Sequence, residues 1–490
     1  MSGANTVEHE RSRLTDASGG CRLIRKKYAI ADFFAGCGGL SHGFELSGRF
    51  NVVLGSDIKP EALATFAANH EGDFGRPETL MEDIQKVSPE TVLSILDAYG
   101  VGGVGELDCL VGGPPCEGFS QNRSINAGGR VVEGTASRVN RFMDDPRNQL
   151  FRWYVELAAF LKPRVVVIEN VPDLVRHKGG ETLKEVLAAL NAAGYVASVR
   201  VLHAADYGVP QMRRRAIFLG QRKDDLARTG AKLQFPEPTH APFPLHFEGL
   251  EEDRAWMPGD SGYWPSVWEA IGDLPPPATG VSQMEAIFPA YTGGADSELR
   301  RFYRTGGAGI HNHVARRLGS AGLEKVRSIV RGQAASDIPD NLRPKASYHY
   351  SYARLRWSEP ARTITKFCYH VGSGMFTHPV EDRAITMREA ARLQTFPDSF
   401  RFVSGNIRDL SAMVGSAVPP LLARAIARSV ARYLDEVQYA QLSPGDRVLV
   451  RPQATDAVMR RLQHEEWGNG ENHNRQASLF PPSGGRLLTT

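Results

Sequence analysis

Ala29-Ile30-Ala31-Asp32-Phe33-Phe34-Ala35-Gly36-Cys37-Gly38-Gly39-Leu40 is the stretch that decides the fold of this chain. Its apolar start, residues 29–34, predicts a strand, and the glycine-rich turn that follows leads into a helix running through Phe44. Such a turn brings backbone N–H groups close to a ligand, although a plain tight turn looks the same. A second strand, residues 52–57, ends in Asp57, where nucleotide-binding sheets place a carboxylate for ribose hydroxyls. Together these features predict a nucleotide-binding α/β sheet.

The same alternation of strands and helices continues along the chain. We expect helices at residues 150–161 and 181–193, and further strands at residues 108–111, 165–168, 195–202 and 216–220. The strand at 165–168 leads directly to Glu169. A carboxylate placed directly after a buried strand costs free energy, so we expect this residue to have a function. Asp83, beyond the second strand, is suited to accept a hydrogen bond from an adenine amino group, although acids in such loops are usually just solvated.

Cys116 is the candidate nucleophile. It lies in Gly112-Gly113-Pro114-Pro115-Cys116-Glu117-Gly118-Phe119-Ser120, at the carboxyl end of the strand at 108–111, where open α/β sheets have their ligand sites. The two prolines restrict the backbone and present the thiol. A thiolate held in this way can attack an electron-poor carbon if an acid accepts the charge that develops. Taken alone the residue is weak evidence, because an isolated cysteine is usually a small buried apolar residue.

A cluster of arginines follows in Gln211-Met212-Arg213-Arg214-Arg215. On an extended segment, Arg213 and Arg215 point to one face and Arg214 to the other, so two guanidinium groups can converge on one site. A surface run of charge is an equally good interpretation of the spacing alone.

Composition sets the limits. The 490 residues, 42% hydrophobic and 23% charged, are typical of a soluble globular protein of two domains with tails. No apolar run approaches membrane-spanning length, and no leader directs export. Five scattered cysteines without a Cys-x-x-Cys pair support neither a disulfide framework nor a zinc site, so we expect no metal and a reducing cytoplasm. The net charge of +3 does not by itself indicate nucleic acid.

The pattern divides the chain into five parts. We expect a flexible leader at 1–27, a catalytic and cofactor-binding domain at 28–225, a second, smaller domain at 226–380, a return to the first domain at 381–437, and a flexible tail at 438–490. Helices at 386–394 and 419–433 should pack beside the cofactor strands. The second domain is irregular and basic, which suits phosphates and guanine edges but also a protein partner. Its basic residues are Arg300, Arg301, Arg304, Arg316, Arg317, Arg343, Lys345, Arg354 and Arg356.

In this order the motifs resemble those of the DNA cytosine 5-methyltransferases of the bacterial modification type, which use S-adenosylmethionine. Phe34-Ala35-Gly36-Cys37-Gly38-Gly39 resembles the family's cofactor loop, Gly113-Pro114-Pro115-Cys116 its nucleophile loop and Glu169-Asn170-Val171 its catalytic acid motif. Gln211 to Arg215 resembles the motif whose arginines support the cytosine and the catalytic residues. The residues at 388–394 and 414–420 resemble the closing motifs. Ser416 departs from the pattern, since the family usually has asparagine there, and the amide's hydrogen bond is in doubt.

The resemblance implies a Rossmann-like methyltransferase sheet with a target-recognition domain, and methylation of carbon 5 of a flipped-out cytosine in a specific double-stranded DNA sequence. It implies catalytic roles for Cys116, Glu169, Arg213 and Arg215. Residues implied to bind S-adenosylmethionine are Phe34, Gly36, Cys37, Gly38, Gly39, Asp57, Ile58, Asp83, Ile84, Pro114, Leu150, Ser416 and Val418. Residues expected to contact DNA are Ser120, Gln121, Arg123, Arg354 and Arg356, and the arginine-bearing segment 121–145 resembles the family's closing loop. We expect a monomer in a bacterial cytoplasm, with a cognate restriction endonuclease as a separate partner.

Three other functions compete. A nicotinamide-dependent oxidoreductase would explain the sheet and Asp57, but the glycine turn lacks the full dinucleotide spacing and Cys116 would have no role. An RNA cytosine methyltransferase resembles a different scheme, in which a second cysteine beside the later strand attacks the base, and here that strand leads to Glu169. A non-catalytic DNA-binding protein derived from such an enzyme is the third alternative. The recognised DNA sequence cannot be read from the chain.

Overall fold

The computed structural model describes residues 27–73, 75–115, 150–242, 262–283, 291–306, 309–329, 338–342 and 350–441, and it also pairs five short strands outside these ranges. Those strands are β1 (Leu14–Thr15), β2 (Cys21–Arg22), β7 (Ile125–Asn126), β11 (Ala286–Ile287) and β13 (Ala346–Ser347). The expected leader and tail therefore lie almost entirely outside the described residues, and so does most of the segment 121–145.

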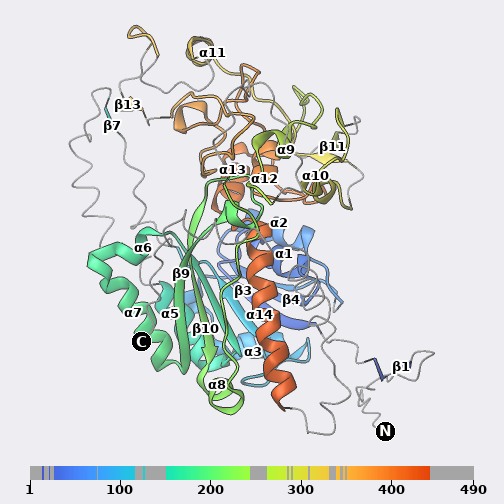
Figure 1. Cartoon of the computed structure of the whole chain (residues 1–490), viewed down its shortest axis with the longest axis vertical. Helices are drawn as coiled ribbons and strands as arrows, with labels where there is room; N and C mark the ends of the chain where they lie inside the picture. Colours follow the sequence, from blue (N-terminus) through green and yellow to red (C-terminus); the bar gives the residue numbers. More distant parts are fainter. Residues whose placement is uncertain are drawn as a thin grey trace, which may run out of the picture.

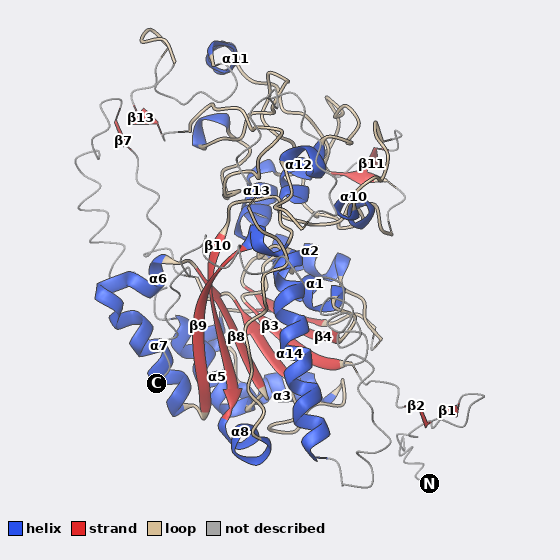
Figure 2. Ribbon diagram, viewed as in Figure 1, coloured by secondary structure: helices blue, strands red, loops and turns tan. Residues whose placement is uncertain are grey.

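A seven-stranded sheet in the order β5-β4-β3-β6-β8-β10-β9 forms the lower half of the molecule in Figures 1 and 2. All neighbouring strands are parallel except that β10 runs antiparallel to both β8 and β9. The strands are β3 (Tyr28–Phe33), β4 (Phe50–Asp57), β5 (Glu78–Met81), β6 (Cys109–Gly112), β8 (Val165–Asn170), β9 (Tyr195–His203) and β10 (Arg214–Arg222). The sheet is therefore mixed, with a parallel core.

Helices cover both faces of this sheet because its central strands are buried on both sides. Ile30 of β3 and Val111 of β6 pack with the helices on one face, and their neighbours Ala31 and Leu110 pack with those on the other. The first face holds α1 (Gly39–Leu46), α2 (Pro60–Asn69) and α14 (Pro420–Gln441), and the second holds α3 (Pro89–Asp97), α5 (Leu150–Leu161) and α7 (Glu181–Ala192). Alternating side chains on continuous apolar strands thus produce a three-layer α/β domain.

Several further helices and strands form a second body in the upper half of Figure 1, poor in regular structure. It contains α9 (Val267–Ile271), α10 (Glu298–Tyr303), α11 (Ser320–Ser328), β12 (Ile310–His311), α12 (Met387–Leu393) and α13 (Ile407–Ser416), and β11 pairs with β12. A buried ion pair joins its early and late parts, because Arg392 of α12 contacts both Asp273 and Asp398. The apolar core runs without interruption from this body into the first face of the sheet.

Most of the expected strands and helices are present, with four corrections. The helix expected at 386–394 beside the cofactor strands packs instead against α9 in the second body, whereas α14 does return to the sheet and packs against α1. The strand expected to stop at Ile168 continues to Asn170, so Glu169 lies within β8. Strand β5 was not expected, because its four residues are partly exposed. The segment Ile407–Gln441 is apolar and long enough to cross a membrane, but 72% of its most apolar window is buried, as in the core helix of a soluble protein.

Helices α1 and α14 approach each other unusually closely at Gly43. A Cβ added there would lie 2.2 Å from the Cβ of Ala423 and 2.5 Å from the carbonyl oxygen of Pro420. Real atoms do not approach so closely, so Gly43 sets the distance between the two helices.

We therefore expect Gly43→Ala to lower the free energy of unfolding by roughly 1–3 kcal/mol, since overpacking outweighs the ~1 kcal/mol that alanine gains in a helix. Urea denaturation measures the change. Gly322→Ala in α11 is the control, because the nearest atom to its added Cβ is 3.9 Å away. A Gly43→Ala protein as stable as the wild type would show that the two helices can separate without cost.

Candidate functional site

The glycine turn between β3 and α1 lies at the carboxyl end of the sheet, and it is held open by backbone hydrogen bonds. Three of its residues have positive φ angles, namely Phe34 at 59°, Gly36 at 56° and Gly38 at 90°. The N–H of Ala35 donates to the carbonyl of Ser56, and the N–H of Gly36 donates to Asp57 Oδ2 at 2.9 Å. The turn is thereby fixed to the end of β4.

Neighbouring contacts make glycine necessary in this turn. A Cβ at Gly38 would lie 2.2 Å from Nε2 of His70, and one at Gly39 would lie 2.5 Å from the carbonyl oxygen of Val418. The turn therefore fits between α2 and the start of α14. Val418, which the resemblance implied as a cofactor contact, thus lies against the turn although most of the chain separates the two in sequence.

Asp57 is in position for the expected ribose contact but already has two partners. Its Oδ1 accepts the N–H of Lys59 at 2.9 Å, and its Oδ2 accepts that of Gly36. Each carboxylate oxygen can accept more than one hydrogen bond, so Asp57 can still accept hydrogen bonds from hydroxyl groups.

Two large apolar side chains are exposed beside Asp57. Ile58 is 62% and Met81 61% exposed, and Met81 is the register partner of Asp57 on the adjacent strand. Exposed apolar groups at the carboxyl ends of two strands suit the flat face of an adenine ring. The described residues therefore fit S-adenosylmethionine, and Met81 is a candidate contact that the sequence did not indicate.

The other expected cofactor residues have mixed surroundings. Asp83 caps the short helix η1 (Ile84–Lys86) by accepting the N–H of Gln85, and Ile84 is buried in the core. Leu150 begins α5, and Ser416 is exposed at the end of α13. Cys37 is buried and donates to the carbonyl of Met413, and burial raises the pKa of its thiol to about 12. Contacts of these residues with a cofactor stay predictions.

Asp32 is a candidate functional residue that sequence reasoning missed. It is 1% exposed, its Oδ2 accepts the hydroxyl of Ser41 at 2.6 Å, and its Oδ1 has no partner among the described residues. Burial raises its pKa to about 7, only partly opposed by the Ser41 hydrogen bond. The signal was an acid inside an apolar strand, two residues before the turn.

The nucleophile loop passes directly over Glu169. A Cβ on Gly113 would lie 3.1 Å from Glu169 Oε2, and Asn170 Nδ2 donates to the carbonyl of Pro114 at 3.2 Å. The side chain of Glu169 is 12% exposed. The expected nucleophile Cys116 lies outside the described residues, but the loop that leads to it is fastened to the acid motif.

Of the two expected arginines, Arg215 reaches the acid and Arg213 does not. Arg215 Nε is 2.6 Å from Glu169 Oε1. Arg213 is fully buried, and its guanidinium donates to the carbonyl oxygens of Ile364, Gly415 and Ser416. Burial lowers the pKa of Arg213 well below its usual value. The two guanidinium groups therefore have different partners and do not converge on one carboxylate.

The expected DNA contacts are only partly described. Ser120, Gln121, Arg123, Arg343 and Lys345 lie outside the described residues. Arg354 is 7% exposed and bonded to Asp382 and to the carbonyls of His378 and Glu381, which makes it a structural residue in this conformation. Arg356 pairs with Glu359.

Several of the expected basic surface residues are likewise engaged internally, since Arg300 pairs with Asp296 and Arg304 with Asp273. Arg301, Arg316 and Arg317 are exposed. The basic surface is therefore smaller than composition suggests.

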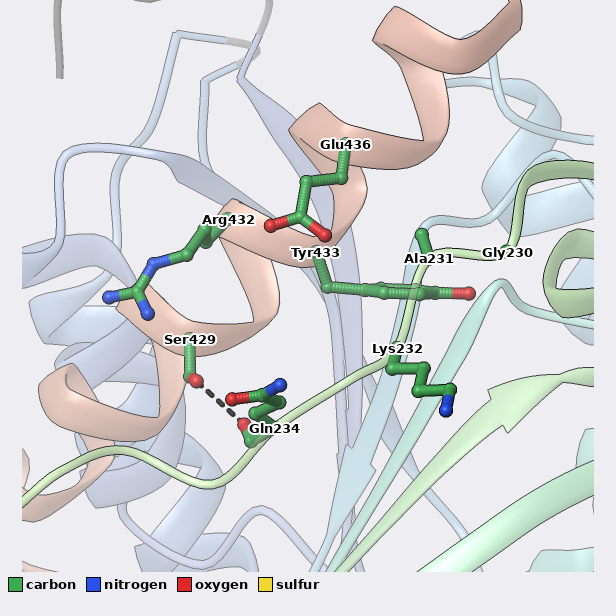
Figure 3. Close-up of a pocket in the computed structure, with 8 residues that line it drawn as sticks. All are labelled: Gly230, Ala231, Lys232, Gln234, Ser429, Arg432, Tyr433 and Glu436. Atoms are coloured by element: carbon green, nitrogen blue, oxygen red, sulfur yellow. Dashed lines mark hydrogen bonds between the residues drawn. The ribbon is translucent and has the colours of Figure 1, made fainter. Parts of the chain in front are cut away.

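A cavity elsewhere in the molecule is separate from this site. It lies between residues 230–234 and α14, where Ser429 donates to the carbonyl of Gln234 (Figure 3). Asp435, on the same part of α14, contacts Tyr28 at the amino end of β3. The cavity is therefore displaced from the carboxyl ends of the strands, where the motif residues meet.

Comparison with known proteins shows which proteins the chain is similar to. The family model for C-5 cytosine-specific DNA methylases matches residues 28–432. Type II methyltransferase M1.HphI of Haemophilus parahaemolyticus is 33% identical over 399 residues, 81% of this chain and 85% of that protein. Type II methyltransferase M.XorII of Xanthomonas oryzae pv. oryzae is 32% identical over 446 residues, 87% and 91% of the two chains.

Among solved structures, a DNA modification methyltransferase encoded within an E. coli prophage matches with a TM-score of 0.61 at 22% identity. The match covers 84% of this chain and all of that one. At this identity it supports the fold alone.

The raised pKa of Asp32 predicts a pH-dependent stability. Between its ordinary pKa near 3.8 and its folded value of about 7, the unfolded chain has lost the proton that the folded protein keeps. Stability contributed by this group is therefore lost as pH rises through that range. Asp32→Asn should gain stability over the wild type between pH 5 and pH 8, by on the order of a few kcal/mol. Thermal unfolding at each pH measures it.

Asp97→Asn at an exposed position is the control and should follow the wild-type curve at every pH. A constant difference between Asp32→Asn and the wild type would mean that Asp32 does not titrate in this range.

Proposed function

The chain belongs to the C-5 cytosine-specific DNA methylases and methylates carbon 5 of cytosine in DNA, and we propose that it does so on a base flipped out of a specific double-stranded sequence. The single observation that carries the proposal is the meeting of Glu169, Arg215 and the backbone of Gly113, three residues before Cys116. A cytosine inside a duplex cannot reach such a buried acid, so the base must leave the stack.

The turn at 34–39, Asp57 and the apolar pair Ile58 and Met81 would hold S-adenosylmethionine. When bound, it supplies an electrophilic methyl group. The backbone N–H groups of the turn, Asp57 and the exposed apolar side chains would bind its polar and aromatic parts at the carboxyl end of the sheet. Pro114 and Leu150 would border the same space from the nucleophile loop and the start of α5.

Cys116 would provide the nucleophile. Its thiolate adds to carbon 6 of the cytosine, which forms a sulfur–carbon bond and turns the ring into an enamine that is nucleophilic at carbon 5. Carbon 5 would then form a bond to the methyl group as the bond between that group and the donor's sulfur breaks. Loss of the carbon 5 proton to a base and expulsion of the thiolate would then restore the aromatic ring. Cys37, Cys109 and Cys368 are buried, and burial raises the pKa of each thiol, so they are poor alternatives.

Glu169 would stabilise the charge that develops on ring nitrogen 3 by donating or sharing a proton there. Arg215 holds that carboxyl through Nε and donates from Nη1 to the carbonyl oxygen of Arg214, so its Nη2 is the candidate to bind the base's carbonyl oxygen. Arg213 would act as a positioning residue, because it fixes the strand end from which Arg215 projects.

Residues 226–380 would recognise the target sequence, and the segment 121–145 would close over the flipped base, with Ser120, Gln121 and Arg123 at its start. The relatives are type II methyltransferases, so a restriction endonuclease of the same specificity would act separately. We propose that the protein works as a monomer.

The covalent step is tested with a duplex that carries 5-fluorocytosine at the target position. Fluorine cannot leave as a proton does, so the thiolate stays attached after methyl transfer. The protein should become permanently joined to this duplex when S-adenosylmethionine is supplied, and not without it. Denaturing electrophoresis detects the adduct, and peptide mapping should find it on Cys116.

Variants separate the roles in this experiment. Cys116→Ser should form no adduct because a hydroxyl is far less ionised than a thiol. Glu169→Gln should trap at least ~100-fold more slowly, a typical loss for a general acid. An adduct on Cys37 or Cys109, or methylation of a verified site without any trappable intermediate, would contradict the mechanism while leaving the family unchanged.

Target recognition is tested by exchanging residues 235–345 for the matching region of a related methyltransferase with a different target. The hybrid should methylate the donor's sequence through the same Cys116 chemistry. Sequencing of modified cytosines in a randomised plasmid library gives the result. An unchanged target would place recognition elsewhere in the chain.

A further inference from the structure

Two histidines and a glutamate form a largely buried cluster beside the glycine turn. His42 and Glu45 are three residues apart on α1, and His70 follows the last residue of α2. One ligand atom from each lies within 4.8 Å of the other two. None of these residues belongs to the site described above, although His70 Nε2 lies against Gly38 of the turn.

The geometry of the cluster is close to that of a coordination site. His70 Nδ1 is 2.6 Å and His42 Nδ1 3.8 Å from the same oxygen, Glu45 Oε2. Ligands about 2.0–2.2 Å from a tetrahedral ion are roughly 3.3 Å apart, a value between the two observed distances. Small side-chain movements would therefore bring all three atoms to bonding distance of one ion.

The polar atoms of the cluster are poorly satisfied. His42 Nδ1, His42 Nε2, Glu45 Oε1 and His70 Nε2 are buried and have no hydrogen-bond partner among the described residues. The side chain of His70 is fully buried. Unpaired buried polar atoms cost free energy. Three side chains, two on α1 and one just after α2, share this deficit, which a bound ligand would remove.

From these contacts we propose that His42, Glu45 and His70 bind one divalent transition-metal ion, with zinc the best fit. Two imidazoles and a carboxylate suit zinc and its neighbours, whereas magnesium and calcium prefer oxygen ligands alone. Water would complete the coordination. The ion would join α1 to the end of α2, and so would fix the turn that lies between them.

This ion has no part in the methyl transfer. Its ligands lie behind the turn, on the side of Gly38 that faces α2. The expected role is structural, so binding can be measured without DNA or S-adenosylmethionine and is independent of the proposed mechanism.

The test uses the untagged full-length protein after dialysis against a chelator. We expect it to bind one equivalent of Co²⁺, with the visible ligand-field bands of a tetrahedral nitrogen and oxygen site. Zn²⁺ should displace the cobalt and raise the unfolding temperature. His42→Gln and Glu45→Gln should weaken binding at least ~100-fold, a greater loss than removal of an outer partner causes.

His203→Gln is the matched control. His203 and Asp206 have the same spacing of three residues and a 3.5 Å contact, but within the described part of the chain no second histidine completes a cluster with them. This variant should bind cobalt as the wild type does. Because His70 is fully buried, His42→Gln, at a partly exposed ring, is the more informative variant. Circular dichroism confirms that each variant is folded.

Three results would overturn the proposal. The wild type could bind no cobalt, which would leave the cluster as a hydrogen-bonded pair of Glu45 and His70. Binding could be unchanged in His42→Gln and Glu45→Gln, which would place the ion elsewhere. The spectrum could show sulfur-to-cobalt charge transfer, which would assign binding to a cysteine.

Discussion

The buried guanidinium of Arg213 is the interaction on which the arrangement of the two bodies depends. Among the described residues it has no carboxylate in an ion pair, and it is held by the carbonyls of Ile364, Gly415 and Ser416, which come from two distant parts of the chain. Gln211, two residues earlier, donates to Leu393 and accepts the N–H of Ile364. A charge without water must be surrounded by such dipoles, so these segments cannot move apart without exposing it or leaving it unpaired. The junction between the sheet and the second body is therefore rigid at the start of β10.

This rigidity continues to Glu169, the proposed catalytic acid. Arg215, one residue into β10, holds Glu169 on the neighbouring strand, and Asn170 holds the carbonyl of Pro114 in the nucleophile loop. The arginine motif is thus held to the Glu169 motif, and the Glu169 motif is held to the loop that leads to Cys116. Such a chain of contacts positions reacting groups before substrate arrives, which is where much of an enzyme's rate enhancement originates.

How much of the fold and of the candidate site could be predicted depended on how far apart in the sequence the interacting residues lie. Strands β3, β4, β6 and β8 were predictable because a continuous apolar run determines a buried strand locally. The glycine turn and the Glu169 motif were found because each is a short continuous stretch of sequence at the end of such a strand. The reversed direction of β10 was not predictable, since it depends on which neighbour it pairs with. The burial of Arg354 depends on Asp382, and the position of Arg213 on Gly415, both far along the chain. Residue type alone could not separate these structural arginines from surface ones.

The packing around the glycine turn explains why buried polar atoms that have no hydrogen-bond partner among the described residues lie at this end of the sheet. Gly38 and Gly39 are confined by His70 on one side and by the carbonyl of Val418 on the other, so packing fixes the shape of a turn in which only glycine fits at these two positions. That packing also buries Asp32 and the cluster of His42, Glu45 and His70, whose polar atoms lose water. A turn fixed in this way presents its N–H groups without reorganisation when a ligand binds. Burying these polar groups beside the turn costs free energy of folding. That cost accompanies a binding site that is already formed at the turn.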